Sequence, residues 1–199
     1  MELNLVQPNH PALRQIADVN IFEANVDVAE FENAMLDLMG NRFGIGLASP
    51  QVGASYNMFV MNHSVHGEIG VYNPEILESS EKTISREEGC LTFPLLFMFI
   101  TRPDTVKVRY TQTDGVTVVE EELFERDSQC FQHEYDHLQG KLFLDDANKF
   151  LPSYLMVIYR FFGLWLITIG LLVLSYVKIT KLGTNQARLS IHSTLFLTL

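Results

Sequence analysis

The stretch from Gln132 to Leu138 contains the pattern His-Glu-x-x-His, and it constrains this chain more than any other feature. If the stretch is helical, His133 and His137 lie four residues apart and project from one face. Two imidazoles at this spacing can share one metal ion, and Glu134 between them can handle the protons of a metal-bound water. An accidental match on a solvated helix is the alternative. At average residue usage, the pattern is expected by chance in roughly one chain in a hundred or fewer of this length. The pattern therefore predicts a helix that carries a metal site.

Such a site needs a third protein ligand and an open position for water, and both cysteines qualify. Cys130 lies one turn before His133, whereas Cys90 lies 43 residues upstream of it, beside a glycine. A metal held between His133 and His137 sits further along the helix axis than Cys130. Cys90 can approach from outside the helix, which favours it and leaves Cys130 as the second candidate. Two cysteines are too few for a disulfide scaffold, so we expect reduced thiols, with a disulfide between them as the alternative.

The charge of the chain changes sharply near Phe150. Residues 1–150 contain all 24 acidic residues and 10 of the 14 lysines and arginines, a net charge of −14, whereas residues 151–199 carry +4. Without a basic stripe, the first part does not match a nucleic-acid-binding surface. The shift predicts a catalytic domain over residues 1–150 and a hydrophobic, basic tail over residues 151–199.

The tail contains a segment of 17 residues without a charge, Phe161–Val177. Its length and hydropathy predict a C-terminal hydrophobic helix over about 161–177 that anchors the chain in a membrane. A helix buried against a partner, or sequence added by a rearranged reading frame, is the alternative. The basic residues on its two sides roughly balance, so its orientation is undecided. The acidic start of the chain, with no apolar run after it, gives no sign of a signal peptide.

Before the tail, the sequence predicts one further helix and several strands. Apolar residues recur at three- and four-residue steps over Val26–Met39, as in an amphipathic helix. Four β-branched or aromatic runs are read as strands, the last two joined by a hairpin turn: Asn57–Asn62, Ile69–Tyr72, Val106–Thr111 and Val116–Glu122. The expected fold class is therefore α+β, with mostly antiparallel sheets packed around the central metal-binding helix.

Two further stretches are rich in glycine and proline. Gly44–Gly53 has three glycines and a proline in ten residues, which indicates unusual backbone dihedrals or a close approach to another group. It does not match a dinucleotide-binding loop, because a third glycine is not at the required place. A tight turn without a function is the alternative. Glu87–Pro94, which contains Cys90, is expected to form a rigid loop.

Together, Gly44–Gly53, Glu88–Pro94 and Gln132–Gly140 resemble the three signature motifs of the peptide deformylases, in the same order and at similar separations. The similarity covers roughly residues 4–147 and leaves the tail outside. Three motifs together are highly specific. The resemblance implies metal-dependent hydrolysis of the N-formyl group from the N-terminal formylmethionine of newly made polypeptides, with release of formate.

The resemblance also implies roles for individual residues. Cys90, His133 and His137 match the metal ligands of the family. Glu134 matches the general acid–base residue, which takes a proton from the metal-bound water and passes it to the leaving amine. The family typically works with Fe²⁺, so we expect this ion in the cell and Zn²⁺, Ni²⁺ or Co²⁺ in a preparation.

Other matches concern the substrate. Gln51 and the backbone N–H of Leu91 match the donors that hold the formyl oxygen as it becomes an oxyanion. Ile45 and Gly46 match the segment that pairs with the substrate backbone by strand addition. Cys130 is assigned to the substrate-binding residues.

The chain departs from the family pattern before the third motif. Family members commonly have Gly, Leu and Ala where this chain has Glu125, Arg126 and Ser128. The leucine helps to line the pocket for the methionine side chain. Arg126 is therefore expected to narrow that pocket or make it more polar, unless its stem packs and its charge reaches water. Glu88 and Arg102 match positions that support the cysteine loop, and we expect an ion pair between them.

Two other functions are compatible with parts of the sequence. A membrane-associated zinc endopeptidase can combine His-Glu-x-x-His with hydrophobic spans, with Asp145 or Asp146 as the third ligand, but it leaves Gly46 and Gln51 without a task. A membrane-tethered binding domain with a structural metal needs four protein ligands, which the sequence does not obviously supply. For a deformylase, the expected partners are formylated nascent peptides and the ribosome exit region. The catalytic domain then lies in the cytoplasm or inside an organelle, with the tail as a membrane anchor.

Overall fold

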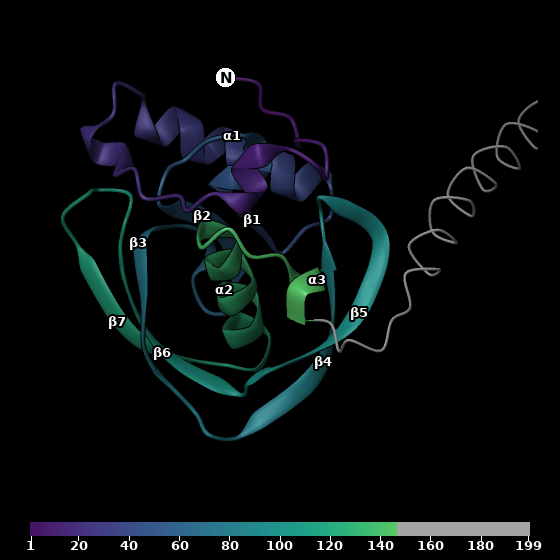
Figure 1. The fold of residues 1–199 in the computed structure, drawn as a ribbon. Coiled ribbons are helices and arrows are strands. Elements are labelled where there is room, and N and C mark those ends of the chain that lie inside the picture. Colours follow the sequence, from purple (N-terminus) through teal and green to yellow (C-terminus); the bar gives the residue numbers. More distant parts are fainter. Residues whose placement is uncertain (147–199) are drawn as a thin grey trace, which may run out of the picture. The chain divides into compact units, whose positions relative to one another are not determined.

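The computed structural model describes residues 1–146, in which seven strands form two antiparallel sheets (Figure 1). One sheet has five strands in the order β1-β2-β3-β6-β7, and β4 pairs with β5 in the other. The strands are β1 Gly46–Ala48, β2 Met58–His63, β3 Gly67–Ser79, β4 Thr83–Cys90, β5 Phe93–Pro103, β6 Thr105–Thr111 and β7 Val118–Phe124. The predicted α+β class with mostly antiparallel sheets is confirmed.

Three α-helices accompany the strands within these residues: α1 Val28–Asn41, α2 Glu125–Leu138 and α3 Phe143–Asp146. Helix α2 lies between the five-stranded sheet and the β4–β5 pair, and it contacts strands of both (Figure 1). Helix α1 begins where the Asp27 side chain accepts a hydrogen bond from the Glu30 N–H at 2.9 Å. Short 3₁₀ helices complete the set: Pro11–Arg14, Ile21–Glu23 and Ser49–Val52.

The alternation of side chains along β6 explains how the sheet holds α2. Val106, Val108 and Tyr110 are buried, whereas the residues between them are exposed or half-buried. Their shared face packs against Phe131 of α2, whose ring meets that of Phe59 edge-on at 5.1 Å between centroids. This side of α2 is buried in the core. The two histidines project from the opposite side, which faces β4.

The structure corrects two expectations about loops and strand ends. Glu87–Pro94 is not a loop, because β4 continues to Cys90 and β5 begins at Phe93. The strand predicted at Ile69–Tyr72 also does not end at the following Asn-Pro pair. It continues to Ser79, since Asn73 takes a φ of 48° and the register with β6 shifts there, so that a bulge accommodates the proline.

Within residues 1–146, no helix has the length and hydropathy that a membrane crossing requires. The hydrophobic helix expected over about 161–177 and the domain boundary near Phe150 lie outside the described residues.

Candidate metal centre

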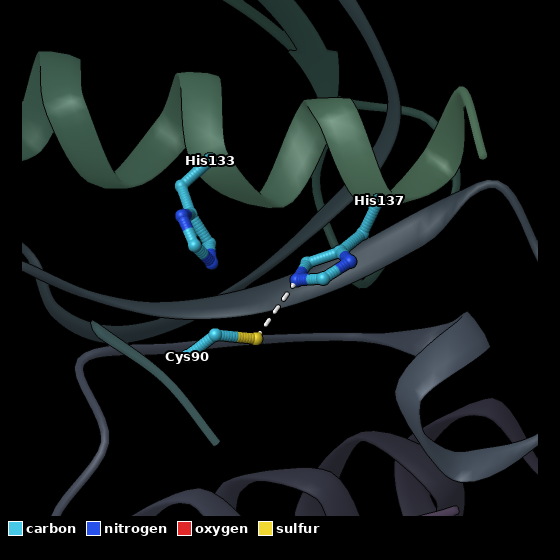
Figure 2. A group of neighbouring side chains, drawn as sticks. All are labelled: Cys90, His133 and His137. Atoms are coloured by element: carbon cyan, nitrogen blue, oxygen red, sulfur yellow. Dashed lines mark hydrogen bonds between the residues drawn. The ribbon is translucent and has the colours of Figure 1, made fainter. Parts of the chain in front are cut away.

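Cys90, His133 and His137 come together where β4 faces α2. Both imidazoles project from the helix toward the Cys90 sulfur (Figure 2). One ligand atom from each of the three residues lies within 4.8 Å of the others, and the distance from Cys90 Sγ to His137 Nε2 is 3.3 Å. Two ligands of a tetrahedral ion bound through sulfur and nitrogen are about 3.5 Å apart at usual bond lengths. The three buried side chains therefore fit a divalent transition metal with one position left open.

Glu88 determines which nitrogen of His133 is available to the metal. Glu88 Oε2 lies 2.9 Å from His133 Nδ1, so this nitrogen donates to the carboxylate and Nε2 is the nitrogen left to bind a metal. Arg102 holds both oxygens of Glu88, with distances of 2.5 and 2.9 Å, and its third nitrogen contacts Asp136 at 2.7 Å. The expected ion pair between Glu88 and Arg102 is thus present. Glu88 does more than support the cysteine strand, because it also orients a metal ligand.

The surroundings of the two histidines shift their pKa values in opposite directions. Burial opposes the charged form of His133, but hydrogen bonds with Cys90 and Glu88 outweigh it and raise the pKa of His133 to about 10 before a metal binds. Burial holds the pKa of His137 well below its ordinary value, so this imidazole is neutral. Burial likewise works against the Glu88 carboxylate, yet hydrogen bonds from His133 and Arg102 lower the pKa of Glu88 to about 2. A metal must therefore displace one proton from His133.

Glu134 lies buried beside these ligands, and its side chain packs against Gly46 of β1. Burial raises the pKa of Glu134 to about 7. Its Oε2 has no hydrogen-bond partner among the described residues, so the carboxyl group is free to accept or give a proton near neutral pH. A Cβ atom at position 46 would overlap the Glu134 carboxyl group. The glycine thus lets the edge strand approach the carboxyl group closely.

Gln51 is fixed by its own loop and points its amide nitrogen toward the metal ligands. Its Oε1 accepts the Ala48 N–H at 2.8 Å, which leaves Nε2 as the donor that faces the metal ligands. That nitrogen lies 3.2 Å from Thr92 Oγ1 and 3.4 Å from Cys90 Sγ. Leu91 follows Cys90 directly, and its side chain contacts Gly44. The two predicted oxyanion donors, Gln51 and Leu91, therefore flank the same cysteine.

The predicted substrate strand is an edge strand. Strand β1 pairs with β2 on one side, and no described strand pairs with its other side. The carbonyl of Ile45, which precedes β1, accepts hydrogen bonds from the Asn62 N–H at 2.9 Å and from Cys130 Sγ at 3.3 Å. Burial raises the pKa of the Cys130 thiol well above its ordinary value. Cys130 therefore supports the Ile45 backbone as a neutral thiol, and the structure does not bring it into the ligand group. Both cysteines are free thiols, so the alternative of a disulfide between them is wrong.

Glu125 and Arg126, which depart from the family pattern before the third motif, lie at the start of α2. Glu125 takes a φ of 50°, the left-handed region in which glycine is favoured, and this is the position where deformylases commonly have glycine. Arg126 donates to the Asn62 carbonyl at 3.0 Å, and its side chain is 51% exposed. The guanidinium group of Arg126 is therefore held at the backbone of β2, and about half of the side chain is exposed.

A second group of ligand types, which the sequence did not indicate, consists of His63, His66 and Glu121. His63 Nδ1 accepts the N–H groups of Val65 at 3.1 Å and His66 at 3.2 Å. The proton of the neutral ring therefore lies on Nε2, the atom that faces Glu121 at 3.5 Å. To bind a metal, Nε2 would have to pass its proton to Nδ1, and both of these backbone hydrogen bonds would then be lost. The tautomers thus favour the Cys90 group over this one.

A family model, curated relatives and a solved structure all match this chain to the same protein family. A family model described as polypeptide deformylase matches residues 2–152. The curated peptide deformylase of Thermotoga neapolitana is 50% identical over 111 residues, which cover 56% of this chain and 66% of that protein. The peptide deformylase of Thermotoga maritima is 44% identical over 136 residues, which cover 68% of this chain and 80% of that protein. The crystal structure of peptide deformylase from Thermotoga maritima superposes with a TM-score of 0.68 at 40% identity, over 74% of this chain and 99% of the solved one.

Proposed function

This chain belongs to the polypeptide deformylase family, and we propose which of its residues carry out the reaction of that family. It is a hydrolase that removes the N-formyl group from nascent polypeptides. The observation that carries the residue assignment is the buried group of one thiol and two imidazoles beside the Glu134 carboxyl group. The endopeptidase alternative has no support, because Asp145 is engaged by Arg14 and does not join the ligand group.

We propose that Cys90, His133 and His137 hold one divalent ion, Fe²⁺ in the cell and Zn²⁺, Ni²⁺ or Co²⁺ in a preparation. The donor set supports this, since thiolate and imidazole suit these ions and Glu88 engages Nδ1 of His133, which leaves Nε2 as the nitrogen for the ion. When bound, the ion lowers the pKa of a water toward 7 and polarises the formyl oxygen.

Glu134 then moves the protons of the reaction. It takes a proton from the attacking water and passes it to the amine as the carbon–nitrogen bond breaks, so that formate and a free amino terminus result. A pKa of about 7 suits both transfers. Gln51 Nε2 and the N–H of Leu91 donate to the formyl oxygen as negative charge develops, and one such donor contributes about 3–4 kcal/mol.

The substrate backbone adds to the free edge of β1 at Ile45 and Gly46. Cys130 holds the Ile45 carbonyl in place for this pairing. Arg126 changes the side-chain preference at the first residue relative to enzymes that carry leucine there. Steady-state rates on formyl-Met, formyl-Leu and more polar formyl peptides test this for wild type and Arg126→Leu, and unchanged ratios contradict it.

We further propose that residues 1–150 form the catalytic domain and that the segment 161–177 of the tail anchors it to a membrane, near the ribosome exit region. The apolar sequence of that segment supports the anchor. The catalytic domain then lies in the cytoplasm or inside an organelle. Detergent-free fractionation of the full chain and of a chain ending at Phe150 tests the anchor, and recovery of both in the soluble fraction contradicts it.

One set of variants tests the site itself: Cys90→Ser, Cys130→Ser and Glu134→Ala, each measured for metal content and formyl-peptide hydrolysis. Cys90→Ser is expected to lose both metal and activity, whereas Glu134→Ala keeps metal and loses activity. Cys130→Ser is expected to keep its metal. If Cys90→Ser retains metal and activity, the assignment of the site fails.

A further inference from the structure

Phe43 is a large apolar residue at a position where the fold gives no reason for one. It follows α1, where its N–H donates to the Gly40 carbonyl at 3.0 Å. The Gly44 N–H donates to the Met39 carbonyl at 2.9 Å, which completes the usual closure of a helix end. Phe43 takes a φ of 57° there, in the left-handed region where glycine is favoured, and it is 97% exposed. The phenylalanine therefore strains the backbone and contributes nothing to the core.

The residues after Phe43 form one wall of the metal centre. Gly44 packs so closely that a Cβ there would lie 2.7 Å from a side-chain carbon of Leu91, which follows the ligand cysteine. Gly46 has the same close relation to the Glu134 carboxyl group. Three residues thus separate Phe43 from the point where β1 meets the proton-transfer residue, a span of at most about 11 Å along the chain. Phe43 therefore lies within reach of a short peptide held at the centre.

Burial along this segment determines the direction in which a bound peptide leaves the centre. Residues 46–51 are all buried, whereas residues 41–45 are exposed or half-buried. The N-terminal segment covers the buried end, where the Val6 N–H donates to the Gln51 carbonyl at 2.9 Å. A peptide that is added to the free edge of β1, with its formyl group at the metal centre, therefore reaches water past Phe43 and runs antiparallel to β1.

We infer that the Phe43 ring packs against the side chain of the third or fourth residue of the substrate and makes the enzyme favour apolar residues there. This inference rests on the proposed function. In antiparallel pairing, the fourth substrate residue lies beside Phe43 when the first lies beside Gly46, and the third is one step away. An apolar side chain at these places removes its own surface and that of the ring from water, whereas serine removes little.

The size of the feature favours this occupant over two others. A single ring offers far less area than the interface of a stable dimer buries. Residues 1–150 carry a net charge of −14, so an anionic lipid surface is repelled. A substrate peptide needs only one such contact, because its first residue is already held at the metal centre.

The test measures kcat/KM for formyl-Met-Ala-Leu-Leu and formyl-Met-Ala-Ser-Ser on the full chain loaded with metal. Wild type is expected to favour the leucine peptide about fivefold, mainly through KM. In Phe43→Gly this ratio is expected to fall to about one- to twofold, while the urea midpoint rises because glycine adopts the φ without strain. Phe43→Leu should keep most of the preference, since it keeps an apolar side chain.

Leu95→Gly is the matched control. Leu95 is also exposed, at 75%, and takes a φ of 65° in β5, so it combines the same apolar character with the same backbone strain. Its replacement should raise the urea midpoint in the same way and keep the wild-type ratio of the two peptides.

Three results overturn the inference: a ratio near one in wild type, an unchanged ratio in Phe43→Gly, or an equal loss of the ratio in Leu95→Gly. An unchanged ratio together with altered sedimentation, or altered partition onto phosphatidylcholine–phosphatidylserine vesicles, assigns Phe43 to a second copy or to lipid instead. Formyl-Met-Ala is too short to reach Phe43, so its turnover by wild type separates these failures from that of the proposed function. If even this peptide is not hydrolysed, the proposed function itself is wrong.

Discussion

Replacing Gly46 with alanine tests how closely the substrate strand is fitted to the proton-transfer residue. The added Cβ would come closer to three atoms of the Glu134 side chain than real Cβ atoms approach their neighbours. Glu134 is buried on α2, so relief requires that the carboxyl group swing away or that β1 move outward. Overpacking of this kind destabilises by about 1–3 kcal/mol. A displacement of about 1 Å in a catalytic group typically lowers the rate about 100-fold. We therefore expect kcat for formyl-Met-Ala to fall about 100-fold, with metal content unchanged.

A matched glycine-to-alanine change provides the control. Gly40 lies in α1, and a Cβ there has no atom within 4 Å. Gly40→Ala should raise the free energy of unfolding by up to about 1 kcal/mol, because alanine is the better helix residue, and should leave kcat unchanged. Metal analysis, steady-state kinetics and urea unfolding on both variants give the result. If Gly46→Ala keeps full metal and a kcat within about threefold of wild type, the close fit between β1 and Glu134 does not control the reaction.

Three further changes test the surroundings of the site. In the metal-free protein, burial raises the pKa of Glu134 from 4.5 to about 7, so the folded state favours its protonated form and wild type loses up to about 3 kcal/mol of stability as pH rises through this range. Glu134→Gln should abolish activity and remove this pH-dependent loss of stability. Urea unfolding at pH 4.5 and pH 8 should show a smaller fall in the free energy of unfolding for Glu134→Gln than for wild type. The exposed Glu81→Gln serves as the control and should behave like wild type. Glu125→Gly should raise the free energy of unfolding by about 0.5–1 kcal/mol, because glycine adopts the φ of 50° without strain, and a loss of stability would refute this account. Glu88→Gln should weaken metal binding about 10- to 100-fold in a chelator competition, since it replaces the charged carboxylate that orients His133 with a neutral amide, and equal affinity would contradict that role.

The ligands on α2 could be predicted because their geometry is local. His133 and His137 share a face as soon as the segment is helical, and the structure has that helix. The choice of Cys90 followed from its freedom to approach from outside. What removes Cys130 from consideration is not visible in sequence, because its hydrogen-bond partner is the carbonyl of Ile45, which is 85 residues away.

The orienting role of Glu88 does not follow from the sequence, because nothing local identifies β4 as a strand. Gly89 and Pro94 suggested a loop, and a loop gives no rule for which side chains share a direction. In a strand, residues two apart point to the same face. Glu88 and Cys90 are the two buried positions at the end of β4, and both turn toward α2. The strand assignment depends on pairing with β5, a tertiary interaction that local composition does not reveal.

The same arrangement shows how two separate elements of the fold are joined at the site. The cysteine comes from a two-stranded sheet and the histidines come from a helix, so a metal ion joins two separate elements. Arg102 of β5 already connects them, since it contacts Glu88 on β4 and Asp136 on α2. Glu88 in turn contacts His133, which makes a continuous chain of charged hydrogen bonds from the sheet to the helix. Removing one member leaves a buried charge without its partner, which is strongly destabilising. The ion-pair network therefore joins the strand that carries Cys90 to the helix that carries the histidines, and it helps to hold the three ligands within reach of one metal ion.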